Sequence, residues 1–175
     1  ELAETCRSLR NLCFRNNKRF VHERLGWNFR MTNLQAAVGL AQLERLDGFL
    51  EKKRSMGLLY QKFLKNVNGV QLPLESTCYA ENHYWVFGIL LSEEYGKADL
   101  MMKKLAAEGV GTRPFFYPLH QQPVIQNKYQ IIQNQRFLVA EKMATFGLYL
   151  PSGLKLSDED IKSVCEKITQ ILKSK

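Results

Sequence analysis

The feature that most constrains the fold is a long helix-compatible run that starts after Thr32. Thr32 and Gln35 have the spacing of a capping box, in which each side chain bonds the other residue's backbone N–H. Apolar residues then recur at helical spacing on one face, formed by Leu34, Ala37, Val38, Ala41 and Phe49. The pattern predicts a long helix over residues 34–65 that bends near Gly48 or Gly57 and connects two domains.

The segments after this helix alternate between strand and helix patterns. Strands are predicted at 84–91, 110–116 and 148–150, and helices at 97–108, 134–146 and after Ser157. Gly109 follows a helix at the C′ position, and Pro114 predicts that its strand lies at an edge or stops early. Strands interleaved with helices on a small sheet indicate a compact α/β or α+β layer.

The last helix has the clearest pattern of the chain. Ser157 and Asp160 have capping spacing, and the helix that follows places apolar residues on one face. These are Ile161, Val164, Cys165, Ile168 and Leu172. At the other end of the chain, the spacing of Leu2, Cys6 and Leu9 predicts a short helix, and residues 14–31 mix aromatic and amide side chains without a period. We predict that this second segment is an ordered, extended loop with a function.

Charge and composition narrow the class of protein. The 175 residues are 45% hydrophobic, which predicts a folded core, and the formal net charge is +8. Such a charge suits nucleic acid, acidic lipid or a phosphorylated small substrate. The cations are dispersed, and the densest group, residues 52–54 beside Glu51, is interpreted as a solvated helix face. No run of 18 apolar residues is present, so we expect no membrane span. Because the cations are dispersed and no nucleic-acid-binding motif is present, we expect no nucleic-acid partner.

The cysteines and histidines do not have the spacing of a metal site or a disulfide framework. They are Cys6, Cys13, Cys78, Cys165, His22, His83 and His120. We predict a reduced, cytoplasmic protein without a metal centre. Cys78 lies close to His83 in sequence, which is compatible with a thiol nucleophile, but nothing local indicates activation. We interpret Cys78 as a buried structural residue.

Two segments carry candidate binding residues. The first, residues 26–32, places Asn28 and Arg30 before a capped helix, where an amide, a guanidinium and a helix N-terminus suit a phosphate. The alternative is that both residues only brace the loop. The residues alone leave both interpretations open.

The second segment, residues 112–123, combines prolines that restrict the backbone with aromatic rings and polar groups. Arg113, Tyr117 and His120 offer donors among flat rings, a composition that suits a sugar or a nucleotide. The alternative is a rigid packed turn whose aromatic rings fill the core. Here too the sequence leaves the choice open.

Together these segments resemble the DegT/DnrJ/StrS family of sugar aminotransferases. The first motif is H-E-R-L-G-W-N-F-R-M-T-N-L-Q-A-A-V-G-L-A-Q-L at 22–43, preceded by L-A-E-T-C-R-S-L-R-N at 2–11. The second is T-R-P-F-F-Y-P-L-H at 112–120, which is closest to perosamine-synthase-like members. The resemblance covers essentially the whole chain.

The resemblance implies a fold-type-I enzyme that depends on pyridoxal 5′-phosphate (PLP) and acts as a homodimer. The family moves an amino group from an amino acid, usually glutamate, to a keto sugar carried by a nucleotide. By this resemblance Asn28 reaches the phosphate of the partner subunit's PLP, with Arg30 beside it. Arg113, Tyr117 and His120 are implied to border the substrate pocket.

The resemblance also implies a domain assignment and a missing residue. Residues 1–33 correspond to the tail of the large PLP-binding domain with its dimer-crossing loop and 34–65 to the connecting helix. Residues 66–175 correspond to the small C-terminal domain, a small, mostly antiparallel sheet covered by helices. The Schiff-base lysine of the family lies upstream of the first motif, and the chain starts at Glu1 without a methionine. We therefore expect a C-terminal fragment that contains no catalytic residue, does not bind PLP by itself and is inactive.

Two other functions remain open at this point. Some relatives replace the lysine with histidine and dehydrate sugars with the same fold, and the deciding residue is not in this chain. A non-enzymatic basic binding or regulatory module is the alternative from another class, and salt-sensitive binding to generic DNA or RNA would favour it.

Overall fold

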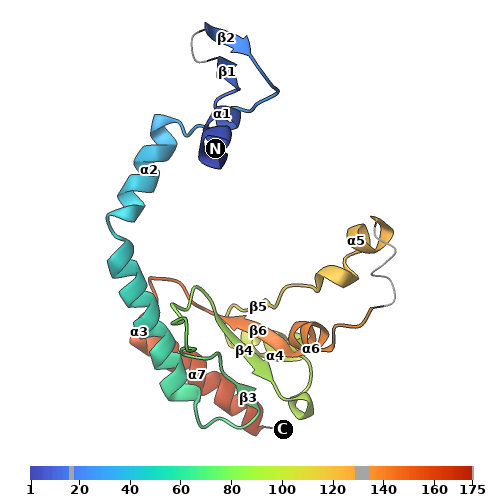
Figure 1. Ribbon diagram of the computed structural model, residues 1–175. Helices are drawn as coiled ribbons and strands as arrows, with labels where there is room; N and C mark the ends of the chain where they lie inside the picture. Colours follow the sequence, from blue (N-terminus) through green and yellow to red (C-terminus); the bar gives the residue numbers. More distant parts are fainter. Residues whose placement is uncertain (16–17, 129–134, 175) are drawn as a thin grey trace. The chain divides into compact units, whose positions relative to one another are not determined.

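The computed structural model describes residues 1–15, 18–128 and 135–174. It contains two compact units, Glu1–Asp47 and Gly48–Lys175, and each is considered by itself (Figure 1).

The first unit consists of two helices and a hairpin. Its elements are α1 (Leu2–Arg10), β1 (Phe14–Arg15), β2 (Lys18–His22) and α2 (Asn33–Leu43). The predicted helix at the start of the chain is confirmed. The segment predicted as a loop contains an antiparallel hairpin, in which the Phe14 ring contacts the rings of Phe20 and His22 at centroid distances of 5.8 and 4.9 Å. The aromatic residues of this segment therefore pair across two strands.

Helix α2 begins with the predicted capping box. The Thr32 hydroxyl accepts from the Gln35 N–H at 3.2 Å, and the Gln35 side chain accepts from the Thr32 N–H at 2.9 Å. The helical run is interrupted at Glu44 and Arg45, where the Arg45 N–H bonds the Gln42 carbonyl at 3.1 Å, three residues back. The predicted bend at Gly48 or Gly57 is therefore wrong, because both glycines lie inside a second helix, α3 (Leu46–Leu64).

The second unit is built on a four-stranded sheet. Its strands β3 (Val70–Gln71), β4 (Phe87–Leu91), β6 (Gly147–Leu150) and β5 (Arg113–Pro114) pair in that order, antiparallel throughout (Figure 1). This confirms the predicted antiparallel sheet with helices. Strand β5 is an edge strand of two residues, as the proline within it predicts.

The described residues of the second unit also form α4 (Ala98–Ala107), α5 (Pro123–Lys128), α6 (Leu138–Phe146), α7 (Asp158–Lys173) and the 3₁₀ turns η1 (Glu93–Tyr95) and η2 (Leu119–Gln121). All five residues predicted on the apolar face of α7 are buried, and the Ser157–Asp160 capping box is present. Gly109 follows α4 with φ +76°, the left-handed conformation expected at C′. Helix α6 begins at Leu138, so the predicted start of this helix is wrong for residues 135–137, which are not helical. Residue 134 lies outside the described residues.

Helix α3 packs on the sheet through Tyr60. The Tyr60 ring stacks on Phe87 at 4.7 Å, and its hydroxyl donates to the Pro151 carbonyl at 2.8 Å, just after β6. Seven residues earlier on α3, Lys53 Nζ donates to the Ser152 carbonyl. Partial burial lowers the pKa of this lysine. The interpretation of residues 52–54 as a solvated face is therefore wrong for Lys53, because its side chain anchors a loop.

Gly57 allows a close approach to α3. The Tyr84 ring, which is 2% exposed, occupies the space where a Cβ at Gly57 would stand. Gly57 is thus required by packing rather than by a bend. Gly48, on the same helix, has open space around its Cβ position.

We expect Gly57→Ala to destabilise the protein by about 1–3 kcal/mol, because the new methyl group overlaps the Tyr84 ring. The matched control Gly48→Ala should instead raise stability by about 0.5–1 kcal/mol, since alanine favours the helix and meets no neighbour. Urea unfolding of the two variants measures both effects. Equal behaviour of the two variants would contradict the packing role of Gly57.

Candidate functional site

The segment that precedes α2 is held by backbone hydrogen bonds to the end of α1. The Trp27 N–H donates to the Leu9 carbonyl at 2.8 Å, the Leu12 N–H to the Trp27 carbonyl at 3.2 Å and the Phe29 N–H to the Arg10 carbonyl at 3.0 Å. Together these bonds hold both sides of Asn28 without using its side chain.

Gly26 is required where this segment crosses the turn after α1. A Cβ at Gly26 would lie 2.7 Å from the Leu12 carbonyl carbon and 2.8 Å from the Cys13 nitrogen. Cys13 is fully buried there, with φ +50°. Backbone packs directly on backbone, so the position of the following residues is well determined.

The structure brings Asn28 and Arg30 together at the surface. Arg30 Nε donates to Asn28 Oδ1 at 3.4 Å, and both side chains are exposed. The backbone bonds brace the segment and Thr32 caps the helix, so neither function needs these two side chains. An exposed amide beside a guanidinium suits the oxygens of a phosphate group.

The second candidate segment runs along the edge of the sheet. Phe115 stacks on Tyr149 at 4.5 Å, over Gly88 and Gly147, where a Cβ would overlap its ring. The packed-turn interpretation therefore holds for Phe115. Phe116, by contrast, is 76% exposed and contacts the Tyr149 ring edge-on at 6.1 Å.

Arg113 lines a cavity of about 600 Å³ beside this edge, together with residues just before β4, at the end of β6 and in the loop after it. Its walls include Trp85, Phe116 and Tyr149. A cation among three aromatic rings is a combination that suits a sugar or a nucleotide. The residues described as lining the cavity do not include Tyr117, which is 57% exposed, or His120.

His120 lies instead in a cluster around Glu141 of α6. Its Nε2 is 3.2 Å from Glu141 Oε1, and its ring is 4.7 Å from that of Phe137. Glu141 also accepts from the Phe137 N–H at 3.0 Å and forms an ion pair with Arg136 at 2.7 Å. These bonds, with that from Arg136 first, lower the pKa of the Glu141 carboxyl to about 2.

Glu141 was not identified from the sequence. The available signal was local: a carboxylate at the start of a helix, four residues after Phe137 and five after Arg136. Its contact with His120 spans 21 residues and depends on tertiary structure.

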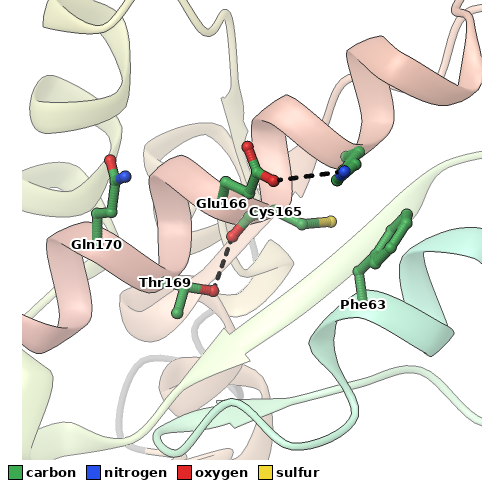
Figure 2. A pocket seen from close by; sticks show the side chains of 6 residues that line it. Phe63, Cys165, Glu166, Thr169 and Gln170 are labelled. Atoms are coloured by element: carbon green, nitrogen blue, oxygen red, sulfur yellow. Dashed lines mark hydrogen bonds and ion pairs between the residues drawn. The ribbon is translucent and has the colours of Figure 1, made fainter.

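A smaller cavity of about 240 Å³ lies between α3 and α7 (Figure 2). In its wall, burial raises the pKa of the Cys165 thiol to about 12, so the thiol stays protonated. Thr169 donates to the Cys165 carbonyl at 2.8 Å, and Lys162 faces Glu166 at 4.0 Å (Figure 2). With its thiol protonated, this cavity offers no evident nucleophile.

The remaining sequence candidates carry no chemistry here. Cys78 and His83 are both exposed, so the predicted burial of Cys78 is wrong. Across residues 1–15, 18–128 and 135–174, no three His, Cys, Asp or Glu side chains group as metal ligands. Among the helices described, none combines the length and apolar character needed to cross a bilayer.

Both candidate segments lie within the part of the chain that matches a known protein family. The profile of the DegT/DnrJ/EryC1/StrS aminotransferase family matches residues 1–169. The chain belongs to this family.

Members of this family resemble the chain in sequence and in structure. The GDP-perosamine synthases of Escherichia coli O157:H7 and Caulobacter vibrioides are 36% and 34% identical to it over 91% and 98% of its length. The aligned regions cover 41% and 46% of those two proteins, so the chain spans less than half of their length. Helicobacter pylori PseC, an aminotransferase involved in pseudaminic acid biosynthesis, matches 99% of the chain and 47% of its own, with a TM-score of 0.87 at 19% identity. This likeness confirms the predicted fold class.

We expect the Glu141 cluster to make stability depend on pH. Because the pKa of Glu141 falls from its ordinary value of 4.5 to about 2 in the folded protein, the carboxylate stabilises the fold above pH 4.5 and loses this effect as the pH falls toward 2. Glu141→Gln should therefore lower Tm at pH 7, and its difference from the wild type should shrink below pH 4.5. A difference in Tm that is constant from pH 7 to pH 3 would contradict this assignment.

Proposed function

We propose that this chain is part of a PLP-dependent aminotransferase that transfers an amino group from an amino acid, glutamate in the first instance, to a keto sugar carried by a nucleotide. Family membership and the similarity to GDP-perosamine synthases support the reaction class. The structural observation that carries the proposal is the exposed Asn28–Arg30 donor pair before α2. When bound, PLP supplies the electron sink and carries the amino group between the two substrates.

Asn28 and Arg30 are proposed to hold the phosphate of the PLP in a partner subunit. The Asn28 amide donates neutral hydrogen bonds and the Arg30 guanidinium supplies charge, so together they fit a phosphate group. Their backbone is fixed by the bonds to α1 and by the close approach of Gly26. The pair would therefore bind the cofactor with little reorganisation.

The surface of α2 supports a homodimer. The helix has no charged residue, and in the described structure none of its residues is buried. Its large apolar side chains are exposed: Leu34 by 81%, Val38 by 67%, Leu40 by 57% and Leu43 by 64%. Exposed apolar surface on this scale marks a contact with another chain or domain. We propose that the partner subunit and the large domain cover it.

The substrate is proposed to contact the second unit. Arg113 would pair with a phosphate of the nucleotide, and the aromatic walls of its cavity would pack against sugar or base. Tyr117 and His120 are proposed to contact sugar hydroxyls. We keep the domain assignment of residues 1–33, 34–65 and 66–175 as part of this proposal.

The reaction also needs a lysine amine that forms the Schiff base with PLP. No lysine of this chain lies in the sequence context that this lysine has in the family. We propose that the Schiff-base lysine lies in the part of the protein outside these 175 residues, in keeping with the 41–46% of the relatives' length that the chain covers. The residues of this chain then act by binding and orienting cofactor and substrate.

The proposal is tested with the full-length protein, PLP, glutamate and a GDP-linked 4-keto-6-deoxy sugar. We expect one 2-oxoglutarate for each aminated sugar, since the amino group lost by glutamate replaces the ketone oxygen of the sugar. That oxygen leaves as water, and a second water supplies the keto oxygen of 2-oxoglutarate. A deoxygenated sugar formed with release of the glutamate nitrogen as free ammonia, in place of an aminated sugar, would indicate a dehydratase. Salt-sensitive DNA or RNA binding without turnover would favour the basic binding module.

Asn28→Ala in the full-length protein should weaken PLP retention about tenfold, because one or two hydrogen bonds to a charged phosphate are lost. The matched control is Asn68→Ala, at an exposed position of the second unit. Bound PLP is measured by its absorbance after dialysis at increasing dilution. If the two variants retain PLP equally, Asn28 is not part of the cofactor site.

A further inference from the structure

The cluster around His120 joins side chains from two segments of the second unit. His120 comes from the turn η2, and Glu141 from the first turn of α6. The two side chains are only 10% and 14% exposed. Both polar groups are therefore largely removed from water. A polar group that is buried without a hydrogen-bond partner costs free energy.

Glu141 can only accept hydrogen bonds in this cluster. Arg136 Nε contacts both carboxylate oxygens, at 3.0 and 2.9 Å, and the low pKa of Glu141 keeps it ionised at neutral pH. An ionised carboxylate has no proton to donate. The contact at His120 Nε2 is therefore an N–H donated by the imidazole.

This assignment determines the chemistry of the other ring nitrogen. In a neutral imidazole one nitrogen carries the proton and the other accepts. With the proton on Nε2, Nδ1 becomes the acceptor. The Phe137 ring against the imidazole, tilted by 52°, restricts the ring from a second side. The arrangement resembles the carboxylate–histidine pairs that orient imidazoles in metal and triad sites.

We propose that Glu141 is a positioning residue for His120: it holds the imidazole as the Nε2–H tautomer, so that Nδ1 accepts a hydrogen bond from a hydroxyl group of the sugar substrate. The inference rests on the proposed function for the identity of the ligand. It deepens that function by specifying which atom of His120 contacts the substrate and which residue prepares it.

The cluster also stabilises the start of α6, and the test must separate this structural effect from the positioning of His120. Arg136 and the Phe137 N–H bond Glu141 without touching the histidine, and these bonds tie the start of α6. Arg136→Gln removes the ion pair but leaves the carboxylate beside His120. It is therefore the matched control for Glu141→Ala, which removes both.

The test uses the full-length protein loaded with PLP. We expect Glu141→Ala to lower kcat/KM for the nucleotide sugar about 3- to 10-fold, the loss of one hydrogen bond to a well-placed acceptor, with kcat/KM for glutamate unchanged. Arg136→Gln should stay within about twofold of the wild type for both substrates. His120→Ala should also reduce kcat/KM for the nucleotide sugar. The double variant should have the same kcat/KM as His120→Ala alone, because both changes remove the same contact.

A spectroscopic measurement tests the tautomer independently of turnover. Nitrogen-15 NMR of histidine-labelled protein should show the Nε2–H pattern for His120, assigned by its absence in His120→Ala, and a tautomer mixture in Glu141→Ala. Glu141→Gln, which preserves the volume of the side chain, replaces Glu141→Ala if that variant does not fold.

Three outcomes overturn the inference: an unchanged His120 tautomer in the Glu141 variants, equal losses of nucleotide-sugar turnover in Glu141→Ala and Arg136→Gln, or additive losses in the double variant. A wild-type protein without aminotransferase activity overturns the proposed function and with it the identity of the ligand. The NMR result still decides whether Glu141 positions the histidine.

Discussion

The second unit depends on the packing of α3 against the sheet through Tyr60. This fully buried residue stacks on Phe87 of β4 and reaches past the sheet to the Pro151 carbonyl. An aromatic side chain that also satisfies a backbone carbonyl gains from apolar burial while leaving no buried polar group unpaired. The helix thereby holds the end of β6 and the loop after it, which form one wall of the cavity that contains Arg113.

The first unit solves a different physical problem, which is to present two polar side chains from a segment without regular structure. It does so by packing backbone against backbone. Gly26 permits the contact, Cys13 accepts a left-handed conformation beneath it, and the N–H and carbonyl groups around Asn28 bond the end of α1. Since the backbone carries the structural role, the side chains of Asn28 and Arg30 are available for a ligand.

The motif at 112–120 contains residues that pack in the fold and residues that are proposed to bind the substrate. Phe115 fills the space above two glycines of the sheet and belongs to the packing. Arg113 faces a cavity with aromatic walls, whereas His120 is held by Glu141 on α6. Residues of one short motif therefore lie in two different places, the cavity at the sheet edge and the cluster around Glu141. The reason is that the chain passes from the sheet edge to a turn within a few residues.

Features that depend on near neighbours were predictable from the sequence. Both capping boxes, the apolar face of α7 and the conformation of Gly109 were inferred correctly, since each involves residues within one or two helical turns. The edge position of Pro114 followed from its missing N–H. The motifs themselves were sufficient to indicate the family.

Only tertiary structure decided the contacts between distant residues. Lys53 bonds a carbonyl 99 residues away, Gly57 lies under the Tyr84 ring, and Glu141 orients a histidine 21 residues before it. The physical reason is that propensity and capping act along the chain, whereas burial depends on which surfaces the fold brings together. A lysine, a glycine and a glutamate on helices look alike in sequence whether they face water or a partner.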